Sequence, residues 1–212
     1  MTTDSPRIPY VDFATLDSAT QAELRRCAAE GTPRPESSAV RAHSPRAFWA
    51  FASSWDALFR SGVVNHELKE LCRVYVSRSV KCEYCGNQRS EAARGAGLAE
   101  AHLDDLMNFE AATRYSDRER AALAYAEAIT WRLEPTDELW ARLGSHFSNE
   151  ELVELGCFIS LTMGQQSWIR LLGLDHQRYL VDGAASRAGL AESVRAGDGA
   201  TLGTTEGHGT SE

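Results

Sequence analysis

Cys82 and Cys85, three residues apart, have the residue type and spacing best suited to chemistry in this 212-residue sequence. If a helix begins near Cys82, both cysteines and Arg89 share one of its faces, and the two sulfurs come within disulfide reach. Unpaired N–H groups and the helix dipole at such a start favour a thiolate, which is the reactive form of cysteine. The pattern therefore has the parts of a dithiol redox pair.

Two less reactive roles fit the same cysteines. Cysteine is among the most buried residue types, so two of them on an amphipathic helix could simply pack in the core. A closed zinc site needs four ligands, and the sequence has no second CxxC or suitably spaced histidine pair, so we expect no metal. The other three cysteines stand alone on apolar stripes and are interpreted as core residues; they are Cys27, Cys72 and Cys157.

Further polar residues are candidates for positions near the pair. A glutamate in a helix normally faces solvent, but Glu70 borders the apolar stripe of Leu71 and Val74, which favours partial burial. His66 lies one helical turn before Glu70 and could share its pocket, although an isolated histidine is more often a surface residue. Gln165 follows an almost wholly apolar run, and we slightly favour a side chain that emerges at the surface or forms a hydrogen bond at a subunit interface.

Helices are the elements that must position these residues. Apolar residues from Phe48 to Leu58 recur at the spacing of one face of an amphipathic helix. Capping boxes at 116–119 and 148–151 predict two further helix starts. The predicted helices cover residues 17–30, 48–62, 66–80, 83–96, 116–131 and 152–172, and residues 31–44 form a loop with at most a short turn. Because segments of alternating polarity are almost absent, the predicted fold class is all-α.

The two ends of the chain differ from the middle in composition. Residues 1–16 form a polar arm with two prolines, and residues 17–182 form the helical domain. From residue 183 to 212 the sequence is rich in Gly, Ser, Thr and Ala, with too few large apolar residues to offset the entropy lost on ordering. We therefore expect a disordered C-terminal tail.

Bulk composition excludes several classes of function. A net charge of −8 argues against nucleic acid or an anionic membrane as a partner, and no apolar run of about 18 residues is present. The first residues lack the basic start and apolar stretch of a signal peptide, so we expect a reducing, cytoplasmic location in which any disulfide is a working one. Since no nucleotide, flavin or haem motif is present, we expect no bound cofactor.

Several segments together resemble one known family. The segment Glu67-Leu-Lys-Glu70-Leu-Cys-Arg73, with Cys82-Glu-Tyr-Cys85 twelve residues after Glu70, is similar to the signature of the carboxymuconolactone decarboxylase and alkylhydroperoxidase D family. The resemblance continues through Ser90-Glu-Ala-Ala-Arg94-Gly-Ala-Gly97 and covers about residues 6–175. It implies an alkylhydroperoxidase D-like helical fold that assembles into homo-oligomers, as trimers or hexamers.

The resemblance also implies roles for individual residues. In the redox members, the cysteine matching Cys85 attacks a peroxide, the cysteine matching Cys82 resolves it as a disulfide, and the glutamate matching Glu70 relays a proton. A dithiol such as dihydrolipoamide then resets the pair. Arg89 stands where those members carry a relay histidine, and an arginine remains charged. It could instead stabilise the Cys85 thiolate or pair with Glu70.

Three hypotheses about function follow. The first is a thiol-dependent, peroxidase-like oxidoreductase that acts on a hydroperoxide or related small electrophile, with Tyr84, His66 and Gln165 as candidate substrate-binding residues. The second is a cofactor-free lyase or isomerase of the decarboxylase branch, in which Arg89 holds a substrate carboxylate and Glu70 or His66 moves a proton. The third is a catalytically silent relative. The CxxC pair favours the first.

Overall fold

The computed structural model describes residues 6–176 and 179–180, and every regular element among them is helical, which confirms the all-α prediction. The tail predicted to be disordered, residues 183–212, lies outside the described residues. None of the helices described has the length and apolarity needed to cross a bilayer. The elements are η1 (Phe13–Thr15), α1 (Ser18–Glu30), α2 (Pro35–Arg41), α3 (Pro45–Trp55), the π-helical turn η2 (Asp56–Arg60), α4 (His66–Ser79), α5 (Glu83–Gly86), α6 (Glu91–Gly95), α7 (Glu100–Asp104), η3 (Leu106–Asn108), α8 (Asp117–Trp131), α9 (Asp137–His146) and α10 (Asn149–Leu172).

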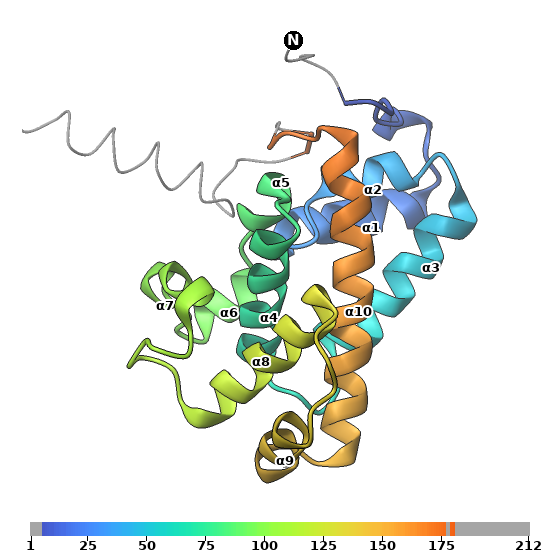
Figure 1. Cartoon of the computed structure of the whole chain (residues 1–212). Coiled ribbons are helices and arrows are strands. Elements are labelled where there is room, and N and C mark those ends of the chain that lie inside the picture. The colour runs from blue at the N-terminus through green and yellow to red at the C-terminus, as the bar shows by residue number, and fades with distance from the viewer. Residues whose placement is uncertain (1–5, 177–178, 181–212) are drawn as a thin grey trace, which may run out of the picture.

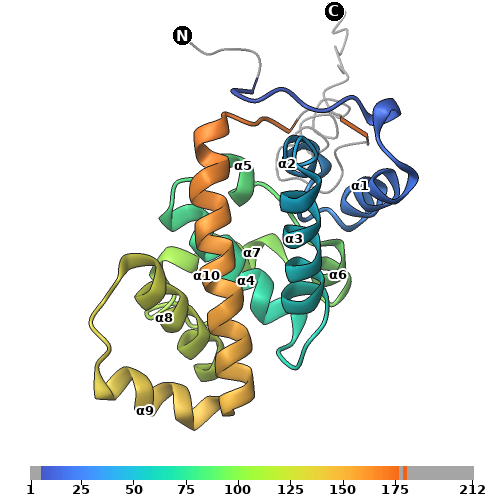
Figure 2. The ribbon, with the colours of Figure 1, turned by 90° about the vertical axis from the view of Figure 1, so that its right-hand side faces the viewer.

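The long helix α10 organises the molecule. It packs against α4 and α8, and its C-terminal half lies beside the short helix α5 (Figure 1). The view in Figure 2 places α3 on one side of α10 and α8 on the other. The shared core includes Leu71, Val76, Leu123, Leu155 and Phe158, each completely or almost completely buried. Helices α4, α5 and α10 thus pack against one another around the two cysteines.

Local capping explains where the longer helices begin. The capping boxes predicted before α8 and α10 are both present. The side chains of Ser116 and Ser148 accept from the backbone N–H groups of Glu119 and Glu151. The carboxylates of these glutamates accept in turn from the backbone N–H groups of the two serines. The second box lies at 148–151 as predicted, but α10 already begins at Asn149, directly after its N-cap Ser148, rather than at Leu152. It ends at Gly173, which has the positive φ typical of a C-terminal cap.

Two predicted segments were wrong in detail. The loop predicted over residues 31–44 contains the helix α2, which has Pro35 in its first turn, where a missing N–H does no harm. The single helix predicted over 83–96 is divided into α5 and α6. The division follows from side-chain hydrogen bonds: Arg73 donates to the carbonyls of Cys85 and Gln88, and Glu70 accepts from the Ser90 N–H, so these groups do not enter a continuous helix.

Candidate active site at the Cys82–Cys85 pair

Cys82 and Cys85 lie at the start of α5 and are joined in a disulfide, with their Cα atoms 5.3 Å apart. Cys82 is the N-cap of α5, and its sulfur accepts from the Cys85 N–H at 3.3 Å. Lys81 connects α4 to this position and has a positive φ of 57°, which is uncommon for a residue other than glycine. Both cysteines are buried, at 2% exposure each. The sequence spacing thus corresponds to a covalent pair at a helix start.

Glu70 is connected to the pair through Arg73, with which it forms a buried ion pair. Its two carboxylate oxygens accept from Nε and Nη2 of Arg73 at 2.6 and 2.8 Å, and one of them also accepts from the Ser90 N–H at 3.0 Å. Arg73 in turn donates to the carbonyl oxygens of Cys85 and Gln88, each at 2.8 Å. The Glu70 carboxylate therefore positions Arg73, which holds the backbone of Cys85 in place.

Arg89 is placed differently from the sequence-based expectation. Its guanidinium pairs with Glu100 at 2.6 and 2.9 Å and donates to the carbonyls of Gly86 and Gln88. The suggested ion pair with Glu70 is wrong, because Arg73 occupies that carboxylate. Arg89 also follows the end of α5, so it does not share a helical face with the cysteines.

The candidate substrate-binding residues separate into two groups. His66 binds the Phe59 carbonyl and the Ser90 hydroxyl at 3.0 and 2.7 Å, and it does not line the cavity at Cys85. The buried Tyr84 hydroxyl donates to Glu36 at 3.1 Å and also lies outside the cavity wall. Gln165 does line the cavity, where its amide oxygen accepts from Arg41.

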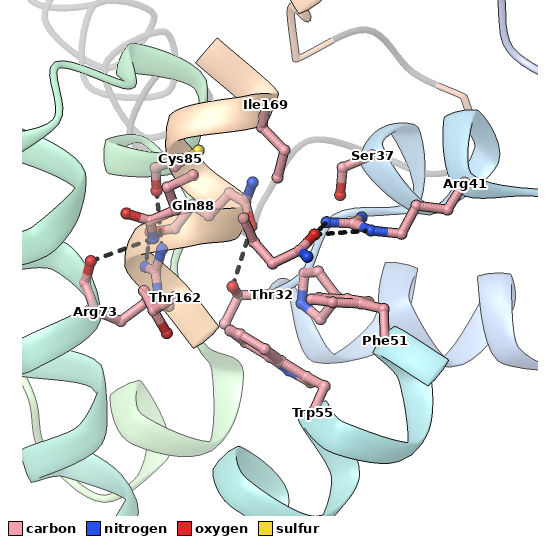
Figure 3. A pocket seen from close by; sticks show the side chains of 13 residues that line it. Thr32, Ser37, Arg41, Phe51, Trp55, Arg73, Cys85, Gln88, Thr162 and Ile169 are labelled. Atoms are coloured by element: carbon pink, nitrogen blue, oxygen red, sulfur yellow. Dashed lines mark hydrogen bonds between the residues drawn. The ribbon is translucent and has the colours of Figure 1, made fainter. Parts of the chain in front are cut away.

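A cavity of about 20 Å³ lies against Cys85, which is room for about one water molecule. Cys82 is not among the residues that line it. Figure 3 shows Cys85, Gln88 and Arg73 on one side of the cavity and Arg41 and Phe51 on the other, with Trp55 below. The lining consists of Thr32, Pro33, Ser37, Arg41, Phe51, Trp55, Arg73, Cys85, Gln88, Thr162, Gln165, Gln166 and Ile169. Cys85 is therefore the sulfur that faces a space where a small group can bind.

Sequence reasoning missed most of the polar lining. On α10, Thr162, Gln166 and Ile169 follow the i, i+4, i+7 spacing of one helical face. Two polar residues on one face of an apolar helix could have indicated a polar cavity wall. No comparable signal exists for Arg41, which lies at the end of the unpredicted helix α2. Desolvation by burial lowers the pKa of Arg41 to about 10.

The pKa shifts of other buried titratable groups follow from their burial. Desolvation raises the pKa of Glu36, although Arg34 pairs with it at 3.1 Å. Burial also raises the pKa of the Cys27 and Cys72 thiols to about 12, which fits their predicted place in the core. Cys157 was predicted to be buried and is exposed, because it lies on the outer face of α10. Among the described residues, no cluster of side chains could hold a metal ion.

Comparison with known proteins places the chain in a family. The sequence model of the carboxymuconolactone decarboxylase family matches residues 45–128. The uncharacterized protein YdfG from Bacillus subtilis (strain 168) is 31% identical over 112 residues, which are 51% of this chain and 73% of YdfG. The chain therefore belongs to the carboxymuconolactone decarboxylase family.

Solved structures confirm the alkylhydroperoxidase D-like fold. A cysteine-to-alanine variant of the debrominase Bmp8, in complex with 2,3,4-tribromopyrrole, superposes with a TM-score of 0.73 and 19% identity, over 90% of this chain and 98% of Bmp8. The alkylhydroperoxidase AhpD core of an uncharacterized peroxidase-related protein from Ralstonia eutropha JMP134 gives a TM-score of 0.67 and 18% identity, over 87% and 100% of the two chains. At these identities the likeness shows a common fold.

Proposed function

We propose that this protein is a thiol-dependent oxidoreductase in which Cys85 attacks a small electrophile and Cys82 resolves the product as a disulfide. The observation that carries the proposal is that Cys85 both lines the buried cavity and is bonded to Cys82. A substrate group in the cavity meets the Cys85 sulfur first, and a partner sulfur stands one helical turn away. A dithiol of the lipoamide kind then restores the two thiols, which suits a reducing, cytoplasmic location.

For a hydroperoxide, the Cys85 thiolate attacks one peroxide oxygen, the O–O bond breaks, and an alcohol leaves after taking a proton. Cys85 is then a sulfenic acid. Attack by the Cys82 thiol forms the S–S bond and releases water, so two electrons pass from the cysteines to the substrate. The external dithiol reduces the pair and becomes a disulfide itself.

A carbon–halogen bond is a second electrophile that the same pair is suited to reduce. The fold neighbour Bmp8 is a debrominase. Replacement of a halogen by hydrogen also consumes two electrons: the two thiols become a disulfide, and the substrate releases halide while one proton goes to carbon and one to solvent. We therefore include halogenated aromatic compounds in the proposed class of small electrophiles.

The contacts at the site do not support the lyase alternative. That hypothesis needs Arg89 to hold a substrate carboxylate, but Glu100 and two backbone carbonyls already bind its guanidinium. It also needs a mobile proton on Glu70 or His66, and Glu70 is held by Arg73. Neither Glu70 nor His66 lines the cavity.

The test is turnover that depends on the two cysteines. Reduced protein is supplied with dihydrolipoamide and either an organic hydroperoxide or 2,3,4-tribromopyrrole, and peroxide loss or bromide release is followed. We expect Cys85→Ser to abolish turnover and Cys82→Ser to stop it after one equivalent, whereas Cys157→Ser keeps the full rate. Unchanged turnover in Cys85→Ser, or no Cys85-dependent turnover of either substrate by the intact protein, would contradict the proposal.

A further inference from the structure

Arg41 is a buried cation without a carboxylate partner among the described residues. Its side chain is 5% exposed, and its Nε and Nη2 both donate to the Gln165 amide oxygen, at 3.3 and 2.7 Å. Its guanidinium carbon lies 3.7 Å from the centre of the Phe51 ring. The other buried arginines of this region differ: Arg34, Arg73 and Arg89 each pair with a glutamate. A buried charge without a counter-ion is costly, so Arg41 calls for an anion from outside the described chain.

Several residues that line the cavity contain an unpaired polar atom. Arg41 Nη1, Trp55 Nε1, Thr162 Oγ1 and Gln166 Oε1 are buried, have no hydrogen-bond partner, and all belong to residues that line it. Buried polar groups are normally paired, so four unpaired polar atoms on residues around one cavity indicate a binding site for a polar ligand. Donors predominate in this set: the guanidinium and the indole can only donate, the threonine hydroxyl can donate as well, and Gln166 Oε1 alone must accept. The set therefore favours an oxyanion over a cation.

Arg41 also lies on the route into the cavity. A larger groove of about 510 Å³ runs between α2, α3 and α10 and is lined by Ile8, Val40, Arg41, His43, Ser44, Ala47, Ala50, Phe51, Ser54, Leu161, Gln165 and Trp168. Arg41, Phe51 and Gln165 line both the groove and the cavity, so they form the wall between them. In Figure 3 the Arg41 guanidinium points toward the space that Cys85 faces from the opposite side.

We propose that Arg41 binds the negatively charged group of the substrate, so that the protein selects small organic anions, carboxylates above all, as its electrophiles. The apolar body of such a molecule occupies the groove, its carboxylate takes the free Nη1 of Arg41 in the wall between groove and cavity, and its reactive atom enters the cavity at Cys85. This inference rests on the proposed function and adds the class of substrate to it.

The test compares iodoacetate with iodoacetamide, which form the same S–C bond and release the same iodide but differ in charge. A reduced Cys82→Ser/Cys157→Ser protein leaves Cys85 as the thiol to be measured, because Cys27 and Cys72 line neither the cavity nor the groove and burial raises the pKa of both thiols to about 12. Rates at Cys85 are followed by peptide mass spectrometry and divided by the rates of 2-mercaptoethanol. We expect a corrected preference for iodoacetate of about tenfold, the effect of one charge-assisted hydrogen bond.

Matched variants identify the source of the preference. Arg41→Gln removes the charge and is expected to bring the corrected ratio to about one, whereas Arg41→Lys keeps part of the preference. Arg46→Gln removes an exposed arginine a few residues away and should leave the ratio unchanged. An Arg41→Gln protein that folds and still prefers iodoacetate overturns the proposal.

A measurement without an Arg41 substitution decides the matter if the variants do not fold. In the same reduced protein, benzoate should slow the reaction of Cys85 with iodoacetamide, and neutral benzamide at equal concentration should not. No protection by benzoate together with a corrected ratio near one overturns the Arg41 site, while turnover that still requires Cys85 keeps the proposed function. Conversely, an intact anion preference with no Cys85-dependent turnover rejects the function and leaves the anion site standing.

Discussion

Arg89 replaces the relay histidine of the redox members that this chain resembles, and its contacts show what an arginine does there. The guanidinium binds Glu100 and the carbonyls of Gly86 and Gln88, which follow the cysteine pair. A histidine has too few donors to make these bonds, and an arginine cannot carry a proton near neutral pH. Arg89 therefore fixes the end of α5, and under the proposed function proton transfer at Cys85 is expected to fall to solvent or to the substrate.

Glu70 gives a prediction about stability. Replacing it by glutamine keeps the shape but leaves the Arg73 guanidinium, 1% exposed, without its counter-charge. We expect Glu70→Gln to lower the free energy of unfolding by about 3–5 kcal/mol, the usual penalty for breaking a buried ion pair. Urea denaturation followed by circular dichroism measures the change.

Glu67→Gln is the matched control for Glu70→Gln. Glu67 lies one turn earlier on α4, is half-buried, and contacts the Asn65 amide rather than an arginine. Its replacement should change the unfolding free energy by less than about 0.5 kcal/mol. Equal small effects of both substitutions would show that the Glu70–Arg73 contact adds little to the fold.

At the residue scale, a role could be predicted from the sequence only where it depends on residues nearby in the chain. Cys82, Cys85 and Glu70 were found because motif spacing within one stretch of chain fixes their neighbourhood. Arg73 and Arg41 were missed because their roles depend on partners brought in by folding: Arg73 binds carbonyls 12 and 15 residues away, and Arg41 meets Gln165 on α10. An arginine on a helix has no sequence pattern that distinguishes a buried one from a solvated one.

At the scale of elements, most long helices were predicted, whereas the ten-residue helix α9 and the short helices were not. The starts of α8 and α10 follow from capping residues that act within one turn. Helices α2, α5 and α6 have only four to seven residues each, too few to show a periodic apolar face. They exist because tertiary hydrogen bonds hold them.

A histidine in the segment after α10 leads to a prediction about how stability depends on pH. His176 Nε2 donates to the Tyr84 carbonyl on α5 at 2.7 Å, and its Nδ1 is buried without a partner. Desolvation by burial, with a further contribution from Arg34, lowers the pKa of His176 below its ordinary 6.5. Below pH 6.5 the unfolded chain therefore binds a proton that the folded chain resists, and the free energy of unfolding should fall as the pH drops through this range.

His176→Gln tests that contribution. The variant should lose less stability than the wild type between pH 7.5 and 5.5 in urea titrations, because it has no imidazole to protonate at this site. His146→Gln, at the end of α9, is the control and should follow the wild-type curve. A His176→Gln curve parallel to the wild type would reject the assignment.

At the scale of the whole molecule, one face carries exposed apolar residues. Trp140 on α9 and Val153 on α10 are 48% and 66% exposed, and they border a groove that also contains Leu152 and Cys157. Exposed apolar surface of this kind usually marks an interface. We therefore propose this groove as a contact between copies of this chain in the homo-oligomer that the family resemblance implies.

Light scattering after size exclusion tests the assembly. We predict a trimer or hexamer for the wild type and smaller species for Val153→Lys, since a charge buried in an interface is strongly unfavourable. Met107→Lys changes an equally apolar residue, 49% exposed on η3, and should keep the wild-type mass. A monomeric wild type at micromolar concentration would reject the prediction.

The disulfide beside the cavity sets the order of events expected under the proposed function. The electrophile oxidises the two thiols to this disulfide and the dithiol then reduces it, so the two reactants meet different covalent states of the protein. The first product is therefore expected to leave before the reductant reacts. Steady-state rates measured against electrophile at several dithiol concentrations should give parallel double-reciprocal lines, the pattern of a ping-pong mechanism. Lines that intersect would mean that both reactants bind at once.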